Sequence, residues 1–227
     1  WLRARLPLFV ALAAVLVLPT LMHAIGLGTT SATEVVIFAI ACMALNILVG
    51  TTGLVSFGHG AWFGLGAYAA ALIQREWVPG HFLLPVLLSV GMVGVIALAF
   101  GALILRRRGV YFSLLTLALA AMLYAIAFRW TAVTGGEDGL GGIVRPSFWG
   151  IDFEVALALY ILVAAIGLAI VYALWRFHRA PVGTVLVAIR ENEQRARFIG
   201  YATDRYKLLA FTLSAMLTGL AGTQIGR

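Results

Sequence analysis

The sequence predicts an all-α fold, a polytopic bundle of transmembrane helices with one short amphipathic helix outside the membrane. Of its 227 residues, 63% are hydrophobic and 11% are charged, and the mean hydropathy is +1.02. Soluble domains carry about 25% charged residues. About seven apolar runs approach the roughly 20 residues that a helix needs to cross a bilayer. The alternating pattern of membrane β-strands is absent from the sequence, so helices are the expected spanning form.

The apolar runs define the expected spans in chain order. The first run is too long for the core of a signal peptide, and further spans follow it, so we expect a retained helix. The second run has Glu34 in its first turn, and the fifth is barely long enough to span. We expect one membrane domain over residues 1–227, belonging to a longer subunit that continues past residue 227. The expected spans are residues 6–27, 32–50, 54–73, 82–105, 111–128, 153–175 and 208–225.

The basic residues favour an orientation with the N-terminus in the cytoplasm, because lysine and arginine concentrate in cytoplasmic loops. The formal charge of +7 does not indicate nucleic-acid binding, since these residues lie between apolar runs rather than on one solvated face. With seven spans, one side holds Arg3, Arg5, Arg106, Arg107, Arg108, Arg176, Arg179, Arg190, Arg195, Arg197, Arg205 and Lys207, and the other holds Arg75, Arg129, Arg145 and Arg227.

The third run contains an expected break in its helix, from Ser56 to Gly60. Gly58 and Gly60 flank His59, and glycine is a poor helix former. A discontinuous helix frees backbone groups near the middle of the membrane, where transporters often bind substrate. Gly60 and Gly64 form a pair that lets another helix approach closely, and plain tight packing explains the small residues of this run equally well.

The candidate pathway residues lie on and near this break. His59 is ionisable within the membrane, which favours a functional role, while a structural hydrogen bond to a neighbouring carbonyl is the simpler interpretation. Asn46 is a polar group in an apolar run, suited to an interhelical hydrogen bond or to the pathway. The expected pathway set is Asn46, Ser56, Phe57, Gly58, His59, Gly60, Trp62 and Phe63.

A polar, basic segment at residues 176–207 separates the last two apolar runs and is the expected cytoplasmic coupling loop. Its apolar residues recur near helical spacing, which predicts a short amphipathic helix whose apolar face docks on a partner. These apolar residues are Val182, Val185, Leu186, Ile189, Ala196 and Ile199.

Several kinds of chemistry are missing from the sequence. No Asp, Glu, Lys or Arg lies deep in an expected span, whereas proton- and ion-driven carriers usually keep such residues there. The chain also lacks the phosphate-binding motif of an ATPase, so any ATP hydrolysis is expected on another chain. Cys42 is the single cysteine, and neither metal-ligand spacing nor a nucleophile pair is present. We therefore expect no metal, no cofactor and no enzyme activity in this chain.

Three separated segments resemble the LivM-type permease subunit of bacterial branched-chain amino acid ABC importers. They read ALNILVGTTGLVSFGHGAWFGLGAYAAAL, RRRGVYFSLLTLALAAMLYAIAFRWTAVTGGEDGL and PVGTVLVAIRENEQRARFIGYATDRYKLLAFTLSAMLTGLAG. The resemblance implies a bacterial inner-membrane subunit that pairs with a LivH-like second permease. It also implies two ABC ATPase subunits that use ATP-Mg, and a periplasmic binding protein that delivers leucine, isoleucine or valine.

The resemblance also implies a coupling helix with an EAAxxxG-like pattern. The nearest match is QRARFIG, in which Ala196 and Gly200 agree with the pattern while Gln194 and Arg195 depart from it. The alternatives are an ABC permease for urea or another small polar solute, a passive channel or facilitator, and, last, a membrane-embedded enzyme. The expected ATPase-coupling residues are Arg190, Glu191, Glu193, Gln194, Ala196, Ile199 and Gly200.

Overall fold

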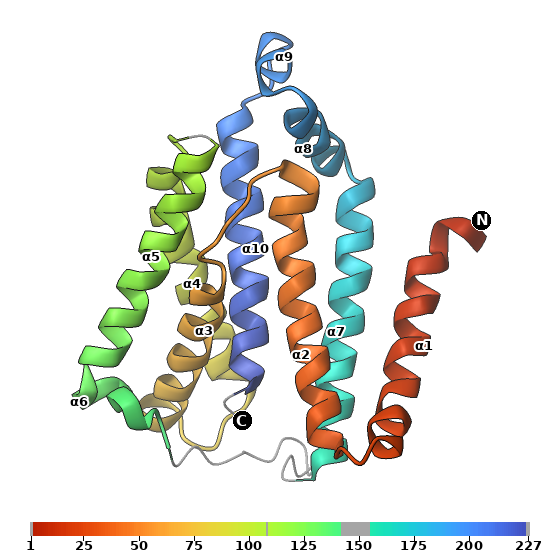
Figure 1. Cartoon of the computed structure of the whole chain (residues 1–227), viewed down its shortest axis with the longest axis vertical. Helices are drawn as coiled ribbons and strands as arrows, with labels where there is room; N and C mark the ends of the chain where they lie inside the picture. Colours follow the sequence, from red (N-terminus) through yellow and green to blue (C-terminus); the bar gives the residue numbers. More distant parts are fainter. Residues whose placement is uncertain (1, 108, 142–154, 226–227) are drawn as a thin grey trace.

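The computed structural model describes residues 2–107, 109–141 and 155–225, and within them the chain is helical and contains no strand. Figure 1 shows the helices standing side by side as a bundle. The elements are α1 (Leu2–Ala24), α2 (Thr29–Asn46), η1 (a π-helix, Ile47–Thr52), α3 (Gly60–Leu72), η2 (a π-helix, Ile73–Trp77), α4 (Leu83–Ile104), α5 (Val110–Arg129), α6 (Thr131–Thr134), η3 (a 3-10 turn, Gly136–Asp138), α7 (Ala156–Arg179), α8 (Pro181–Glu191), α9 (Glu193–Phe198) and α10 (Thr203–Ile225).

The predicted polytopic helix bundle is confirmed, and six of the described helices are long and apolar enough to cross a membrane. They are Leu6–Ala24, Thr29–Thr52, Leu83–Ile104, Val110–Arg129, Ala156–Arg179 and Thr203–Ile225. The remaining expected span, 54–73, is not one continuous helix. Residues 53–59 are non-helical, and α3 begins only at Gly60. The extended segment and α3 traverse the bundle together (Figure 1).

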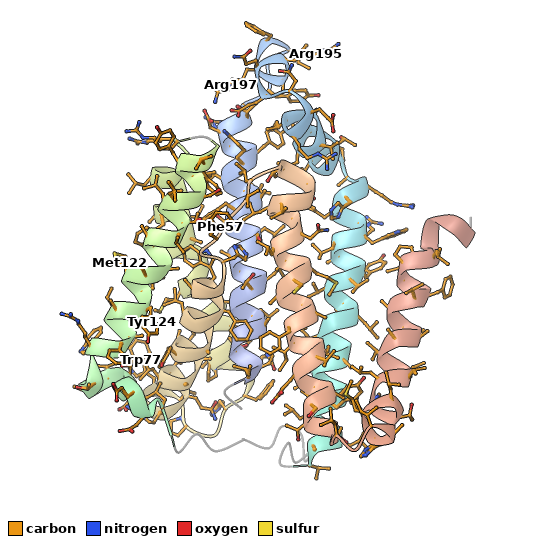
Figure 2. All side chains as sticks on the ribbon, in the orientation of Figure 1. Phe57, Trp77, Met122, Tyr124, Arg195 and Arg197 are labelled. Atoms are coloured by element: carbon orange, nitrogen blue, oxygen red, sulfur yellow. The ribbon has the colours of Figure 1, made fainter. Side chains whose placement is uncertain are left out.

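Most of the basic residues gather at the end of the bundle that carries α8 and α9, which we call the basic end. Arg195 and Arg197 lie there (Figure 2), and Arg106 lines the same cavity as Arg197 and Arg205. The predicted grouping of these arginines on one side is therefore confirmed. Which side of the membrane the basic end faces stays a prediction. Arg108, Arg145 and Arg227 lie outside the described residues.

Helix α10 lies at the centre and packs against α2, α3 and α4. Glycines let its backbone touch that of α3: a Cβ added at Gly66 would lie 2.2 Å from the Gly219 carbonyl oxygen, and one at Gly222 would lie 2.0 Å from that of Phe63. The close approach predicted at Gly60 and Gly64 is wrong within the described chain, since a Cβ at either would meet nothing within 4 Å. Small residues allow close contact, but the neighbour's position decides which of them are used.

Candidate coupling and transport sites

The expected helix break is confirmed over residues 56–59, but it begins earlier, at Gly53, where η1 ends, and Gly60 already belongs to α3. Gly53 has a positive φ of 72°, a conformation that glycine adopts without the cost a side chain would add. The Leu54 amide returns to the Leu48 carbonyl oxygen at 3.1 Å, which closes the wide turn. Such π-helical turns occur frequently at functional sites. The glycine therefore releases the chain into the extended segment, 53–59.

Helix α5 holds the extended segment by its polar side chains. The Ser113 hydroxyl donates to the Val55 carbonyl oxygen at 2.6 Å, and the Phe57 amide donates to the Thr116 hydroxyl at 3.2 Å. These bonds replace the helical backbone bonds that the break removes, and an unpaired backbone group in lipid costs several kcal/mol. Sequence reasoning missed Ser113 and Thr116. Their signal was two small hydroxyl residues on one side of an otherwise apolar helix.

His59 closes the extended segment with a buried hydrogen-bond chain. The Ser214 hydroxyl donates to the Ala44 carbonyl oxygen at 2.5 Å and lies 2.9 Å from His59 Nε2. A hydroxyl has one hydrogen, so His59 Nε2 must carry the proton and donate to Ser214. These two hydrogen bonds therefore join α2, the break and α10. His59 therefore has a structural role, as the simpler interpretation predicted, but its partner is the Ser214 hydroxyl and not a carbonyl. The predicted pathway role stays untested.

We predict that Ser214→Ala destabilises the protein by about 1–3 kcal/mol, because it leaves the buried His59 N–H without an acceptor. The expected result is a lower midpoint of thermal unfolding for the detergent-purified protein. Thr212→Val on the same helix is the matched control, since the buried Thr212 hydroxyl has no hydrogen-bond partner among the described residues. Equal midpoints for the two variants would contradict the proposed hydrogen-bond chain.

The structure does not gather the predicted pathway residues around one cavity. Phe57 points outward with 62% of its surface exposed (Figure 2), whereas Trp62 is 1% exposed and packs edge-on against Phe211. The Phe63 ring stacks on Phe38 with centroids 5.7 Å apart. Only Phe57, of these three predicted aromatic residues, offers most of its surface to a solute or a partner.

Asn46 also differs from its expected role. It is exposed, and its amide lies so close to Gly50, one turn along, that a Cβ there would be 2.2 Å from its Oδ1. No described neighbouring helix receives the interhelical hydrogen bond that we expected. By contrast, Ser56 is buried, and its hydroxyl has no hydrogen-bond partner among the described residues.

At the basic end, the predicted amphipathic helix is confirmed as α8, but the prediction for its apolar face is wrong. Val185, Leu186 and Ile189 are buried in the chain's own core, with α2, α7 and α10. Amphipathic periodicity shows that one face is covered without showing what covers it. The charged face also contacts the bundle, because Arg190 Nη1 donates to the Gly50 carbonyl oxygen at 2.5 Å. Helix α8 is therefore a fixed platform beside η1.

Helix α8 ends before Asn192, and a second short helix, α9, follows it and projects beyond the bundle (Figure 1). The Asn192 side chain caps α9 by accepting from the Arg195 amide at 2.9 Å. Phe198 and Ile199 at its end are 90% and 68% exposed. Gly200 follows with a φ of +96°, which favours glycine. The surface open to a partner is therefore the end of α9, and Phe198 was missing from the predicted set.

An ion network ties α9 to the first turns of α10. Glu193 accepts from Lys207 Nζ at 2.9 Å and from Arg197 Nη2 at 3.1 Å, and Arg197 also reaches Asp204 at 2.7 Å. Lys207 is 3% exposed, and Arg197 Nε donates to the Thr203 hydroxyl at 2.8 Å. A buried ammonium needs paired carboxylates. This network fixes the orientation of α9 relative to the first turns of α10.

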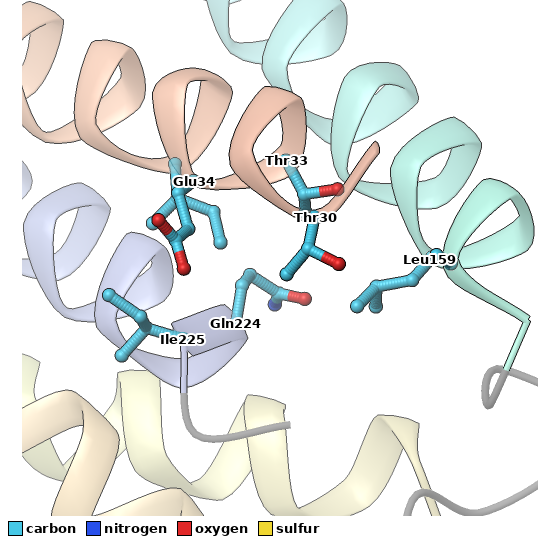
Figure 3. Close-up of a pocket in the computed structure, with 8 residues that line it drawn as sticks. Thr30, Thr33, Glu34, Leu159, Gln224 and Ile225 are labelled. Atoms are coloured by element: carbon cyan, nitrogen blue, oxygen red, sulfur yellow. The ribbon is translucent and has the colours of Figure 1, made fainter. Parts of the chain in front are cut away.

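At the opposite end, α2, α7 and α10 enclose a pocket of about 120 Å³ (Figure 3). The Thr223 hydroxyl donates its one hydrogen to Leu220, so it can only accept from Gln224 Nε2 at 2.9 Å. That fixes the amide orientation and leaves the buried Gln224 Oε1 without a partner within the described part of the chain. The Glu34 carboxylate lines the same pocket. The pocket thus presents hydrogen-bond acceptors at the end opposite α9. No group of acidic, histidine and cysteine side chains suited to a metal occurs among the described residues.

The sequence of this chain is similar to those of known transport proteins. The chain is 30% identical over 220 residues to the high-affinity branched-chain amino acid transport system permease protein LivM of Escherichia coli, covering 85% of this chain and 50% of that protein. It is 29% identical over 219 residues to LivM of Salmonella typhimurium, with the same coverage. It is 29% identical over 133 residues to the autoinducer 2 import system permease protein LsrC of Klebsiella pneumoniae, covering 57% of this chain and 36% of that protein.

The chain spans about half the length of the curated LivM relatives that it matches. No solved structure matches it significantly. Residues 28–226 match the family described as the permease component of the branched-chain amino acid transport system. The matched region includes the helix break, both helices of the basic end and all of α10. This chain, a multi-pass membrane protein, therefore belongs to the branched-chain amino acid transport permease family.

Proposed function

We propose that this chain is a membrane-spanning subunit of an ATP-driven importer that carries branched-chain amino acids across the bacterial inner membrane. Membership of the permease family and the similarity to LivM proteins support this substrate class. In this proposal, two ABC ATPase subunits hydrolyse ATP-Mg on separate chains and act at the basic end, in the cytoplasm. A LivH-like second permease and a periplasmic amino-acid-binding protein complete the assembly.

A continuous contact path from α9 to the helix break is the observation that carries the proposal. The end of α9 exposes Phe198, and the ion network joins α9 to α10 through Glu193 and Lys207. Further along α10, Ser214 is bonded to His59 at the break. A force applied to α9 by a closing ATPase pair would therefore move α10, and α10 would displace the extended segment.

The substrate contact that we propose lies at this segment. Non-helical backbone near the middle of a membrane offers polar groups to a charged solute, which suits the zwitterionic head of an amino acid. The exposed ring of Phe57 offers an apolar surface for a branched side chain. At the end of the bundle opposite α9, Glu34 and Gln224 Oε1 suit the ammonium group of an arriving amino acid, because both offer hydrogen-bond acceptors.

We predict that Phe198→Ala combined with Ile199→Ala reduces ATP-driven leucine uptake at least tenfold without destabilising the permease. Two exposed apolar side chains contribute nothing to the chain's own core, but an aromatic anchor at an interface centre is worth about 2 kcal/mol or more. Uptake into vesicles that contain the complete importer is one readout. Copurification of the ATPase subunits is the second, and both should fall together.

Tyr111→Ala is the matched control, because Tyr111 is 72% exposed on α5 and lies outside α9. Normal uptake and full ATPase copurification in the double variant would contradict the coupling role of α9. A passive facilitator makes the opposite prediction for the wild-type protein, since it would move leucine down its gradient with no ATPase bound.

The substrate is tested separately from the energy source. The similarity to an autoinducer 2 permease shows that this family extends beyond amino acids. Urea or another small polar solute is therefore the competing cargo. Excess unlabelled isoleucine or valine is expected to compete with radioactive leucine in vesicles of the complete importer, whereas urea should leave leucine uptake unchanged. Competition by urea alone would favour the alternative.

A further inference from the structure

A groove at the basic end is not used by the transport proposal. It lies between the end of α4 and the beginning of α10 and has a volume of about 510 Å³. Apolar and charged residues line it together: Gly101, Ala102, Leu105 and Leu208 on the apolar side, and Arg106, Arg197, Asp204 and Arg205 as the charged groups. A cavity that combines an apolar wall with guanidinium groups suits an amphipathic ligand with an anionic head.

The charges around the groove are unbalanced. Asp204 also lines it, but that carboxylate already pairs with Arg197 at 2.7 Å and with Lys207 at 3.3 Å. Arg106 and Arg205 have no acidic partner among the described residues, and both are exposed. The two guanidinium groups are therefore available to an outside anion. Arginine binds phosphate oxygens through paired N–H donors, which makes phosphate a better match than a diffuse negative charge.

The position of the groove along the candidate membrane spans favours a lipid, rather than a soluble anion, as the source of that phosphate. Gly101 belongs to the span Leu83–Ile104, and Leu208 belongs to the span Thr203–Ile225. The apolar lining thus lies at the basic ends of two candidate membrane spans, with Arg106 just beyond the first span and Arg205 in the first turn of the second. Anionic lipids place their phosphates at this level, where nearby basic residues attract them. A soluble anion would gain nothing from the apolar wall.

We propose that the groove between α4 and α10 binds the phosphodiester headgroup of an anionic phospholipid. Arg106 and Arg205 hold the phosphate from the two helices, and the first part of an acyl chain lies against Leu105 and Leu208. The bound lipid then bridges α4 to the first turn of α10, beside the ion network that positions α9. This inference does not depend on which solute the permease carries.

The test measures lipid retention by the purified full-length protein with native mass spectrometry. The probes are dioleoylphosphatidylglycerol and, as the zwitterionic comparison, dioleoylphosphatidylcholine. We expect the wild-type protein to retain phosphatidylglycerol preferentially, and Arg106→Gln with Arg205→Gln to lower that retention at least tenfold. Arg195→Gln is the matched control, because Arg195 is exposed at the same end but does not line the groove. It should retain phosphatidylglycerol as the wild type does.

Further measurements distinguish a lipid site from a site for free phosphate and from a protein interface. Equal retention of the two lipids by the wild type, or equal loss in the control variant, would overturn the proposal. Displacement of phosphatidylglycerol by millimolar glycerol phosphate would assign the groove to a free phosphate instead. Loss of a copurifying protein from the double variant with unchanged lipid retention would make it a protein interface. The single variants Arg106→Gln and Arg205→Gln provide the same readout with half the charge change, and each should show partial loss.

Discussion

Gly58→Ala is expected to abolish most of the transport activity and to lower stability by about 3 kcal/mol, the upper part of the range for overpacking a tight contact. A Cβ at Gly58 would lie 1.8 Å from the Thr116 carbonyl oxygen and 3.1 Å from the Ala120 methyl group. Backbone lies on both sides of this contact, so no rotamer change relieves the clash. The extended segment would have to leave α5, which breaks its bonds to Ser113 and Thr116.

The measurement is the thermal unfolding midpoint in detergent, together with leucine uptake by vesicles that contain the importer. Gly64→Ala is the matched control, because it adds the same methyl group to α3 where nothing lies within 4 Å. Alanine also favours a helix over glycine by about 1 kcal/mol, so the control should unfold at the same temperature as the wild type or slightly above it. Similar midpoints for both variants would refute the close contact between the break and α5.

Glu193→Gln is expected to uncouple transport from ATP hydrolysis. The substitution removes the carboxylate that Lys207 and Arg197 share between α9 and α10. Breaking a fully buried ion pair costs about 3–5 kcal/mol, and here we expect about 2 kcal/mol because Asp204 still accompanies Lys207. With α9 no longer held to α10, the ATPase subunits should continue to hydrolyse ATP while leucine uptake falls at least fivefold.

The double variant Glu193→Gln with Lys207→Met separates stability from coupling. Removing both charges eliminates the uncompensated buried ammonium, so thermal stability should return towards the wild-type value. Uptake should stay low, because the connection between the helices is still missing. Glu76→Gln is the control, since the exposed Glu76 pairs with the neighbouring Arg75 at 2.8 Å and lies outside the expected coupling residues. Recovery of uptake along with stability would show that the network is structural and does not transmit movement.

The sequence predicted most of the elements of the basic end but not their contacts. The periodicity of Val185, Leu186 and Ile189 correctly indicated an amphipathic helix. It could not show that this face packs against the chain's own helices. Hydropathy indicates that a face is buried, but it does not identify the surface that buries it. A docking surface was accordingly assigned to α8, whereas the most exposed apolar side chains of residues 181–200 are Phe198 and Ile199 at the end of α9.

The helix break gives the same lesson within the membrane. Glycines around His59 correctly predicted non-helical backbone, since their conformational freedom is a local property. The residues that hold this segment, Ser113, Thr116 and Ser214, come from helices about 60 to 155 positions away. No local pattern connects them with the break. Similarly, the small residues of α3 indicated close packing, but contact occurs at Gly66 and not at Gly60 or Gly64.

Three separated motifs of the sequence carried the resemblance to the family. The sequence by itself also determined the membrane class, the helical form, the approximate positions of six spans and the grouping of the basic residues. These follow from composition and short-range periodicity, because lipid demands local backbone hydrogen bonding and long apolar runs. Only the tertiary structure decided what holds the extended segment, which surface of the basic end stays open, and how α9 is joined to α10. Those features depend on close contacts between distant parts of the chain, where a shift of one helical turn exchanges one partner for another.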